Sequence, residues 1–133
     1  MSERLDREKR IREKFNKIFK VASKKKRIAP SGSASTHEFD IYNEGKFIGG
    51  INTRRRLTSS GKNNTGGQDR VSSEILWLSL WRGSERRVLI LTDKEMIEHL
   101  KRKYEGWEFP HYIEVYYIDE HTLEMNKEPF ILH

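Results

Sequence analysis

The 133-residue chain contains no cysteine and no long apolar run, and each absence excludes a class of protein. Without cysteine there is no disulfide framework and no thiolate metal site. No run approaches the ~20 apolar residues that span a bilayer, and the N-terminus is charged, unlike a secretory signal. We therefore expect a soluble, cytoplasmic protein of one domain with a modest core and no membrane partner.

Several signatures of catalysis are also missing. No Gly-Lys-Ser/Thr sequence follows Gly66-Gly67, so a nucleotide-binding loop is not indicated. There is no Gly-x-Ser-x-Gly nucleophile elbow. The five histidines are scattered, and no pair has the spacing of metal ligands on one helix. Among the five, only His37 borders the acidic segment that contains Glu38 and Asp40.

Positive charge is concentrated near the N-terminus. Residues 1–28 contain 12 Lys/Arg against 4 Asp/Glu, a net charge of +8, whereas residues 29–133 have a net charge of −2. This asymmetry favours a polyanionic partner, and we expect nucleic acid, most of all DNA. A solvated helix face with a frayed tail is the alternative. The expected nucleic-acid-binding residues are basic and lie in two segments: Lys24, Lys25, Lys26, Arg27, Arg54, Arg55, Arg56, Lys62 and Arg70.

The basic N-terminal segment predicts a helix packed on the domain formed by the rest of the chain. Apolar residues recur at helical spacing between Ile11 and Ala22. Ser2 is the expected cap of this helix. We expect the helix to end near the basic cluster at residues 24–27, before a turn or short linker at Pro30-Ser31-Gly32-Ser33.

Residues 36–53 predict a β-hairpin around an Asn-Glu-Gly turn. Glu38 and Asp40 lie two residues apart on its first strand, so both should point to one face. Phe39 and Ile41 should then point to the other face. A carboxylate on one strand that faces a second strand is a common beginning of a metal-dependent nuclease site.

The remaining pattern alternates between helices and strands. We expect a mobile polar loop at 54–68, a buried helix from Asp69, a central strand at 86–92, a helix with a Thr92–Glu95 capping box, and a strand at 113–118. This order predicts an α/β fold, a small mixed β-sheet flanked by helices.

The order of elements and two short motifs resemble the PD-(D/E)XK nuclease superfamily, which includes many restriction endonucleases. The motifs are HEFDIY at 37–42 and IGGINT at 48–53, and the resemblance covers residues 36–118. It implies a restriction-endonuclease-like fold and a DNA endonuclease that hydrolyses phosphodiester bonds with magnesium, for which manganese substitutes. In that family, carboxylates on the two strands hold the cation, and a lysine two residues beyond the second carboxylate positions or activates water.

This chain departs from the family pattern on the second strand. Asp40 matches the metal-binding Asp, but Gly50 stands at the second carboxylate position and Asn52 at the lysine position. Asn52 can orient a water or a phosphate oxygen, but it cannot carry positive charge. The resemblance therefore implies Asp40, assisted by Glu38, as the metal ligands, and Asp40, Glu38, Asn52 and Glu74 as the catalytic set.

Three explanations of the departure stay open at this point. In the first explanation the chain has the nuclease fold but has lost the catalytic activity, which leaves a non-catalytic DNA- or RNA-binding or protein-interaction module. Alternatively, the second carboxylate has moved, and Glu38, Glu74 or Glu8 approaches Asp40. For Glu74, on the buried helix, we expect an exposed edge, with a position facing the site as the other option. In the third explanation the hairpin is purely structural. The sequence also leaves open whether the chain forms a homodimer.

Overall fold

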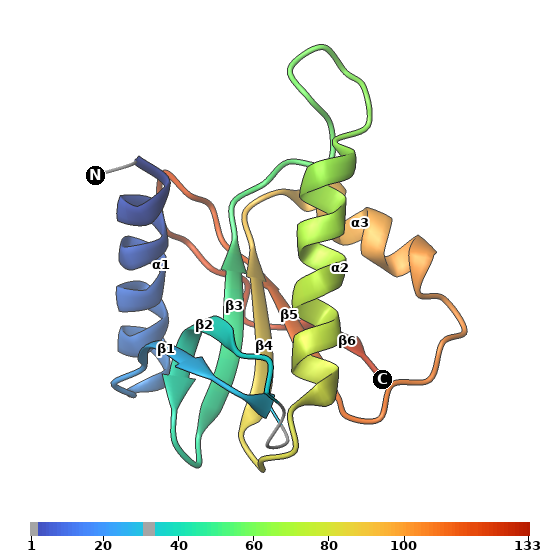
Figure 1. Cartoon of the computed structure of the whole chain (residues 1–133). Helices are drawn as coiled ribbons and strands as arrows, with labels where there is room; N and C mark the ends of the chain where they lie inside the picture. The colour runs from blue at the N-terminus through green and yellow to red at the C-terminus, as the bar shows by residue number, and fades with distance from the viewer. Residues whose placement is uncertain (1–2, 31–33) are drawn as a thin grey trace.

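The computed structural model describes residues 3–30 and 34–133, and these form a six-stranded mixed sheet flanked by helices. The elements are α1 Glu3–Phe19, β1 Lys24–Ile28, β2 His37–Asn43, β3 Phe47–Asn52, α2 Thr65–Leu80, β4 Arg86–Leu91, α3 Lys94–Lys103, β5 Ile113–Tyr117 and β6 Phe130–Leu132. The strands lie side by side in chain order (Figure 1). The β3–β4 and β4–β5 pairs are parallel, and the other pairs are antiparallel. The predicted α/β class with a mixed sheet is confirmed.

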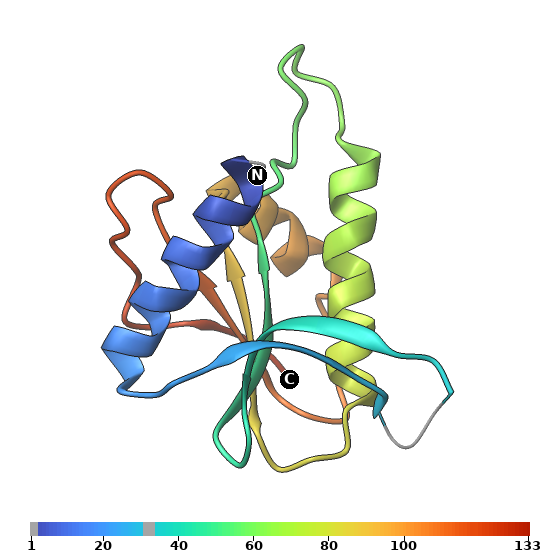
Figure 2. The same cartoon turned by 60° about the vertical axis from the view of Figure 1, so that its left-hand side comes forward.

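The helices cover opposite faces of the sheet, so the molecule has two apolar cores (Figure 2). Helix α1 contributes Ile11 and Phe15 to the first core. Helices α2 and α3 contribute to the second, with Ile75 and Leu100 among its buried residues. In the described part of the chain, every helix is too short or too polar to cross a membrane.

Strand β4 lies between the two cores. Val88 and Ile90 pack toward α1, whereas Leu89 and Leu91 pack toward α2 and α3. This follows from the two-residue period of a strand, and a strand with parallel neighbours on both sides is usually buried on both faces. The predicted central strand, apolar on both faces, is confirmed.

The basic N-terminal segment is a helix followed by a strand. Helix α1 ends at Phe19, and Lys20 has a positive φ of 56° that stops it. The helix therefore ends near the basic cluster, as expected, and the cluster itself forms β1, an edge strand paired with β2. An edge strand keeps its lysine side chains in solvent while its backbone is paired. The expected cap at Ser2 and the turn at Ser31–Ser33 lie outside the described residues.

Strand β2 contains a bulge at the position of its acidic residue. The register with β1 shifts so that Lys25 faces two residues of β2, Asp40 and Ile41. A bulge changes the face to which the following side chains point. Phe39 therefore enters the core beneath α2, and Ile41 enters the core beneath α1. The expectation that these two residues share a face is wrong for this reason.

Helix α2 begins at Thr65, four residues before the expected start at Asp69. The side-chain oxygen of Asn64 accepts a hydrogen bond of 3.0 Å from the Gly67 N–H, which caps the helix. A Cβ atom at position 67 would lie 2.6 Å from the Asn64 amide nitrogen, so the close cap requires glycine there. The cap shortens the preceding loop, whose ends are joined by a Leu57–Asn63 bridge.

Helix α2 buries one stripe rather than its whole surface. Val71, Ile75 and Leu78 face the sheet and are buried. Leu76 and Leu80 are 57% and 50% exposed, so the helix is buried against the sheet, as expected, but along one stripe only. Only residues at a spacing of three or four can face one sheet, whatever the polarity of the others.

The start of α3 also differs from the expectation of a Thr92–Glu95 capping box. Asp93 is the N-cap residue, and its side chain makes no capping hydrogen bond. Its carboxylate instead accepts a hydrogen bond of 2.7 Å from the Arg56 N–H. Asp93 therefore ties the loop before α2 to the helix after β4.

Candidate functional site

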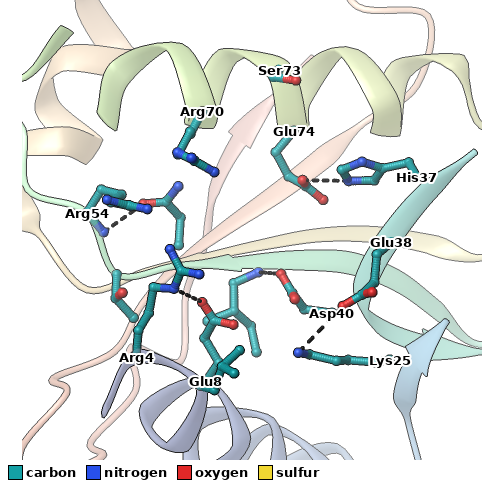
Figure 3. A pocket seen from close by; sticks show the side chains of 14 residues that line it. Arg4, Glu8, Lys25, His37, Glu38, Asp40, Arg54, Arg70, Ser73 and Glu74 are labelled. Carbon is teal, nitrogen blue, oxygen red and sulfur yellow. Dashed lines mark hydrogen bonds and ion pairs between the residues drawn. The ribbon is translucent and has the colours of Figure 1, made fainter. Parts of the chain in front are cut away.

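A pocket of about 280 Å³ lies between α1 and α2 at the carboxyl end of β3 (Figure 3). Side chains from α1, β1, β2, α2 and the segment at the end of β3 line it. The structure brings many of the sequence-predicted site residues together here: Lys25, Glu38, Asp40, Asn52, Arg54, Arg70 and Glu74. Their convergence depends on the fold, because they come from four separate segments of the chain.

The other predicted basic residues do not line this pocket. The Lys26 ammonium lies over the Tyr42 ring, 5.2 Å from its centroid. Arg27 contacts Glu38, with 3.7 Å between a guanidinium nitrogen and a carboxylate oxygen. The remaining ones are outside the pocket lining as well: Lys24, Arg55, Arg56 and Lys62. Only some of the predicted basic residues therefore line the pocket.

Asp40 is the partly buried carboxylate of the pocket. Its Oδ2 atom accepts a hydrogen bond of 2.8 Å from the Ile51 N–H on β3. Burial raises the pKa of Asp40 to about 7, against the lowering effect of that hydrogen bond. The negative charges of Glu74 and Glu8 raise this pKa further. A cation at the pocket would relieve the cost of ionising Asp40.

Glu74 fills the space that a side chain at Gly50 would need. A Cβ atom built on Gly50 would overlap the Glu74 carboxylate, with Cδ only 2.5 Å away. The Glu74 side chain is 14% exposed and turned into the pocket, so its expected place at an exposed edge is wrong. Its Oε1 atom is buried without a hydrogen-bond partner among the described residues. An unpartnered carboxylate oxygen is costly unless a ligand satisfies it.

His37 holds Glu74 in this orientation. Its Nε2 atom lies 2.8 Å from Glu74 Oε2, which leaves Oε1 as the unpartnered oxygen. The imidazole is stacked on Trp77, with ring centroids 4.8 Å apart and an angle of 11° between the planes. It also meets the Phe39 ring edge to face. His37 is therefore a positioning residue whose only sequence signal is its place next to the acidic strand.

Glu38 has a different environment from Glu74. Its carboxylate is paired with Lys25 at 3.5 Å and with Arg27 at 3.7 Å. Its side chain is 44% exposed, at the outer part of the pocket. Because two cations and solvent already compensate its charge, the geometry favours Glu74 over Glu38 as the second carboxylate beside Asp40.

Arginine side chains lie together across the pocket from Asp40 (Figure 3). Burial lowers the pKa of the Arg54 guanidinium, and the positive charges of Arg70 and Arg4 lower it further. Arg4 contacts Glu8 at 3.8 Å. Over residues 3–30 and 34–133, neither Arg54 nor Arg70 has a carboxylate within ion-pair distance. Such a cluster favours an anionic ligand, and phosphate oxygens match guanidinium geometry.

Two further residues complete this wall of the pocket. The Asn52 side-chain oxygen accepts a hydrogen bond of 2.8 Å from the Arg54 N–H, so it fixes the turn that presents Arg54. The Asn52 amide nitrogen is the group left to donate to a water or a phosphate. Arg4 was not predicted from the sequence. Its signal is helical spacing, because it lies four residues before Glu8 on the stripe that continues to Ile11.

The donor set fits a magnesium or manganese ion held by two carboxylates. In the part of the chain that the structure describes, no group of three or more His, Cys, Asp or Glu side chains is arranged to hold a metal. Magnesium, however, is commonly held by one or two carboxylates, with water and substrate phosphate completing its shell. Asp40 and Glu74 supply two carboxylates, and the unpartnered Oε1 of Glu74 is a free donor atom.

Comparison of the chain with protein-family models, with curated proteins and with solved structures gave no match. The pocket itself is therefore the basis for a functional proposal.

Proposed function

We propose that this protein is a restriction-endonuclease-like, magnesium-dependent DNA endonuclease that hydrolyses phosphodiester bonds. The observation that carries the proposal is the Glu74 carboxylate, which fills the space left by Gly50 in the pocket that holds Asp40. It supports the explanation in which the second carboxylate has moved, from strand β3 to helix α2. The antiparallel β2–β3 pair, followed across α2 by parallel β4, is the arrangement expected for such a nuclease.

The pocket divides into a carboxylate side and a guanidinium side, which suits a phosphodiester and a divalent cation together. When bound, magnesium polarises the phosphoryl group and lowers the pKa of water. Asp40 and Glu74 would hold the ion, and Arg54 with Arg70 would hold phosphate oxygens. The water oxygen forms a bond to phosphorus as the bond to the leaving sugar oxygen breaks. The water proton leaves to solvent, and the leaving oxygen takes up a proton from solvent.

Glu74→Gln tests the proposal directly. Glutamine keeps the shape and a hydrogen bond to His37, but it removes the charge that would hold the cation. We expect manganese binding, measured by calorimetry, to be lost. Magnesium-dependent nicking of a supercoiled plasmid should fall about 100-fold or more, because a catalytic metal ion supplies several kcal/mol of transition-state stabilisation.

Glu98→Gln is the matched control for this experiment. Glu98 lies on α3, outside the pocket, and is paired with Lys101 at 3.2 Å. This variant should bind manganese and cleave like the unmodified protein. If Glu74→Gln binds manganese normally, Glu74 is not the second ligand. If all three folded proteins neither bind manganese nor cleave, the non-catalytic alternative replaces the nuclease.

A second prediction concerns the phosphate side of the pocket. Changing Arg54 and Arg70 together to Ala should weaken duplex DNA binding and reduce the slope of log affinity against log salt by about 2, one for each phosphate contact. Fluorescence anisotropy in metal-free buffer measures both quantities. The control removes the same charge from outside the pocket, by changing Arg55 and Lys62 to Ala. Equal losses in the two double variants would show that the pocket is not the DNA-binding surface.

A further inference from the structure

Lys25 brings positive charge to the carboxylate side of the pocket. Among the described residues that line the pocket, it is the only lysine. The bulge in β2 places it opposite Asp40 and Ile41 on the neighbouring strand. Bulges are frequent next to active sites, where they re-aim a side chain. The next lysine of β1, Lys26, lies over the Tyr42 ring instead and does not line the pocket.

The charges around Lys25 suit a role in chemistry better than a role in stability. Its one ion pair within the described residues is with Glu38 at 3.5 Å, and that carboxylate also contacts Arg27. An ion pair at this degree of exposure contributes little to stability. The positive charge of Lys25 also acts on Asp40, where it opposes the rise in pKa. The arginines Arg54 and Arg70 lie on the other wall of the pocket (Figure 3).

We propose that Lys25 is a catalytic residue of the phosphodiester hydrolysis, with an ammonium group that orients the attacking water beside Asp40 and stabilises the negative charge developing on it. This inference rests on the proposed function. Asn52, at the end of β3, is uncharged, so Lys25 supplies from β1 the ammonium that this side of the pocket otherwise lacks. A lysine suits the role, because it is a compact point charge with three donors on a flexible stem.

The ammonium keeps its three protons throughout the step. The water oxygen bonds to phosphorus and the bond from phosphorus to the leaving sugar oxygen breaks, while Lys25 donates a hydrogen bond to the attacking oxygen. The proton lost by the water leaves to solvent, and the leaving oxygen gains one from solvent. The products are a phosphate monoester end and a hydroxyl end.

Lys25→Met in the full chain separates this role from metal binding. We expect magnesium-dependent plasmid nicking to fall about 100-fold or more, as for the loss of a group that stabilises developing charge. Manganese affinity, measured by calorimetry, should instead rise roughly threefold to tenfold, because a positive charge near the carboxylates has been removed. Circular dichroism checks the fold, and Lys25→Gln replaces Lys25→Met if the latter is unfolded.

Two control variants separate a chemical role of the Lys25 ammonium from a purely structural role of its ion pair with Glu38. Glu38→Gln breaks the ion pair but keeps the ammonium, so its loss of nicking activity should be at least about tenfold smaller than that of Lys25→Met. Lys101→Met removes the same charge outside the pocket, from a lysine that is paired with Glu98 at 3.2 Å, and should keep activity. If Glu38→Gln loses as much activity as Lys25→Met, the ion pair is what matters and the proposal is overturned.

A rescue variant provides the strongest check. Asn52→Lys introduced into the Lys25→Met protein places an ammonium in the same pocket from β3, and we expect it to restore nicking at least about tenfold, or 1.4 kcal/mol. If the unmodified protein cleaves and Lys25→Met cleaves equally well, the role of Lys25 is refuted while the nuclease stands. If the unmodified protein neither binds manganese nor cleaves, the proposed function fails, and the role of Lys25 with it.

Discussion

Asp40→Asn should make the metal-free protein more stable at pH 8 and should change its stability little at pH 4. Burial raises the pKa of Asp40 from 3.8 to about 7, so ionising this side chain is unfavourable in the folded protein. Asparagine carries no charge and still accepts the hydrogen bond from the Ile51 N–H. The expected gain in the free energy of unfolding at pH 8 is up to about 4 kcal/mol.

The sign of this effect follows from the raised pKa. A carboxyl group whose folded pKa exceeds its unfolded value contributes stability below the unfolded value, and that contribution is lost as pH rises through the folded value. The two proteins should therefore have similar stability near pH 4, diverge between pH 4 and 7, and differ by a constant amount above. Urea unfolding over a pH series measures the difference. A variant no more stable than the original at pH 8 would contradict the buried, unpaired state of Asp40.

Asp119→Asn is a control of opposite sign. Backbone hydrogen bonds from Thr122 and His121 lower the pKa of Asp119. Its stabilising contribution is therefore present at neutral pH and lost as pH falls through the folded pKa. This variant should be the less stable one at pH 7, and its difference from the original should shrink toward acid pH.

Manganese should narrow the stability difference that Asp40→Asn creates at pH 8. A ligand that binds only the folded state stabilises it, by about 2.7 kcal/mol at a hundred times its dissociation constant. The unmodified protein should therefore show a higher melting temperature with manganese, whereas Asp40→Asn should show no shift. The absence of a shift in both proteins would count against a metal site at Asp40.

The second large effect is expected from moving the pocket carboxylate from α2 to β3. Glu74→Ala should lower manganese affinity at least about tenfold, because one of two carboxylate ligands is lost. Gly50→Glu should destabilise the protein by about 1–3 kcal/mol, since its side chain would overlap the Glu74 carboxylate. The combined variant removes the overlap and returns a carboxylate to the pocket. It should recover both stability and manganese affinity, with a coupling energy of about 1–3 kcal/mol.

Gly49, next to Gly50, supplies the control for this double-mutant cycle. A Cβ atom at Gly49 would overlap the Val88 backbone oxygen, which a change at Glu74 cannot relieve. Gly49→Ala should therefore be destabilising to the same extent with or without Glu74→Ala. Additive effects in the Gly50 cycle as well would show that Glu74 does not occupy the place of the missing side chain. Adding Asn52→Lys to Gly50→Glu alone should crowd the pocket further.

The local pattern of the sequence is sufficient to predict the β2–β3 hairpin and the central strand β4. Residues 37–43 and 47–52 flank a turn in which Gly45 has a positive φ of 76°. Residues 86–91 are apolar enough to be buried on both faces. These properties depend on nearest neighbours along the chain, so they can be derived before any tertiary contact is known.

Two strands had no such local signal. The basic residues of β1 have little strand propensity, and they become a strand because their backbone completes the edge of β2. Strand β6, Phe130–Leu132, has three residues and is defined by its antiparallel pairing with β5. In both cases a partner distant in the sequence supplies the hydrogen bonds that stabilise the strand.

The sequence by itself determined that Asp40 lies on a strand and that Gly50 and Asn52 carry no charged side chain. Only the tertiary structure decided which charged side chains lie beside them. Helix α2 packs against β3 and places the Glu74 carboxylate in the space that a side chain at Gly50 would occupy. Likewise, Lys25 faces Asp40 because of a register shift between two strands. Distances between side chains on different elements depend on packing and register, which local pattern does not specify.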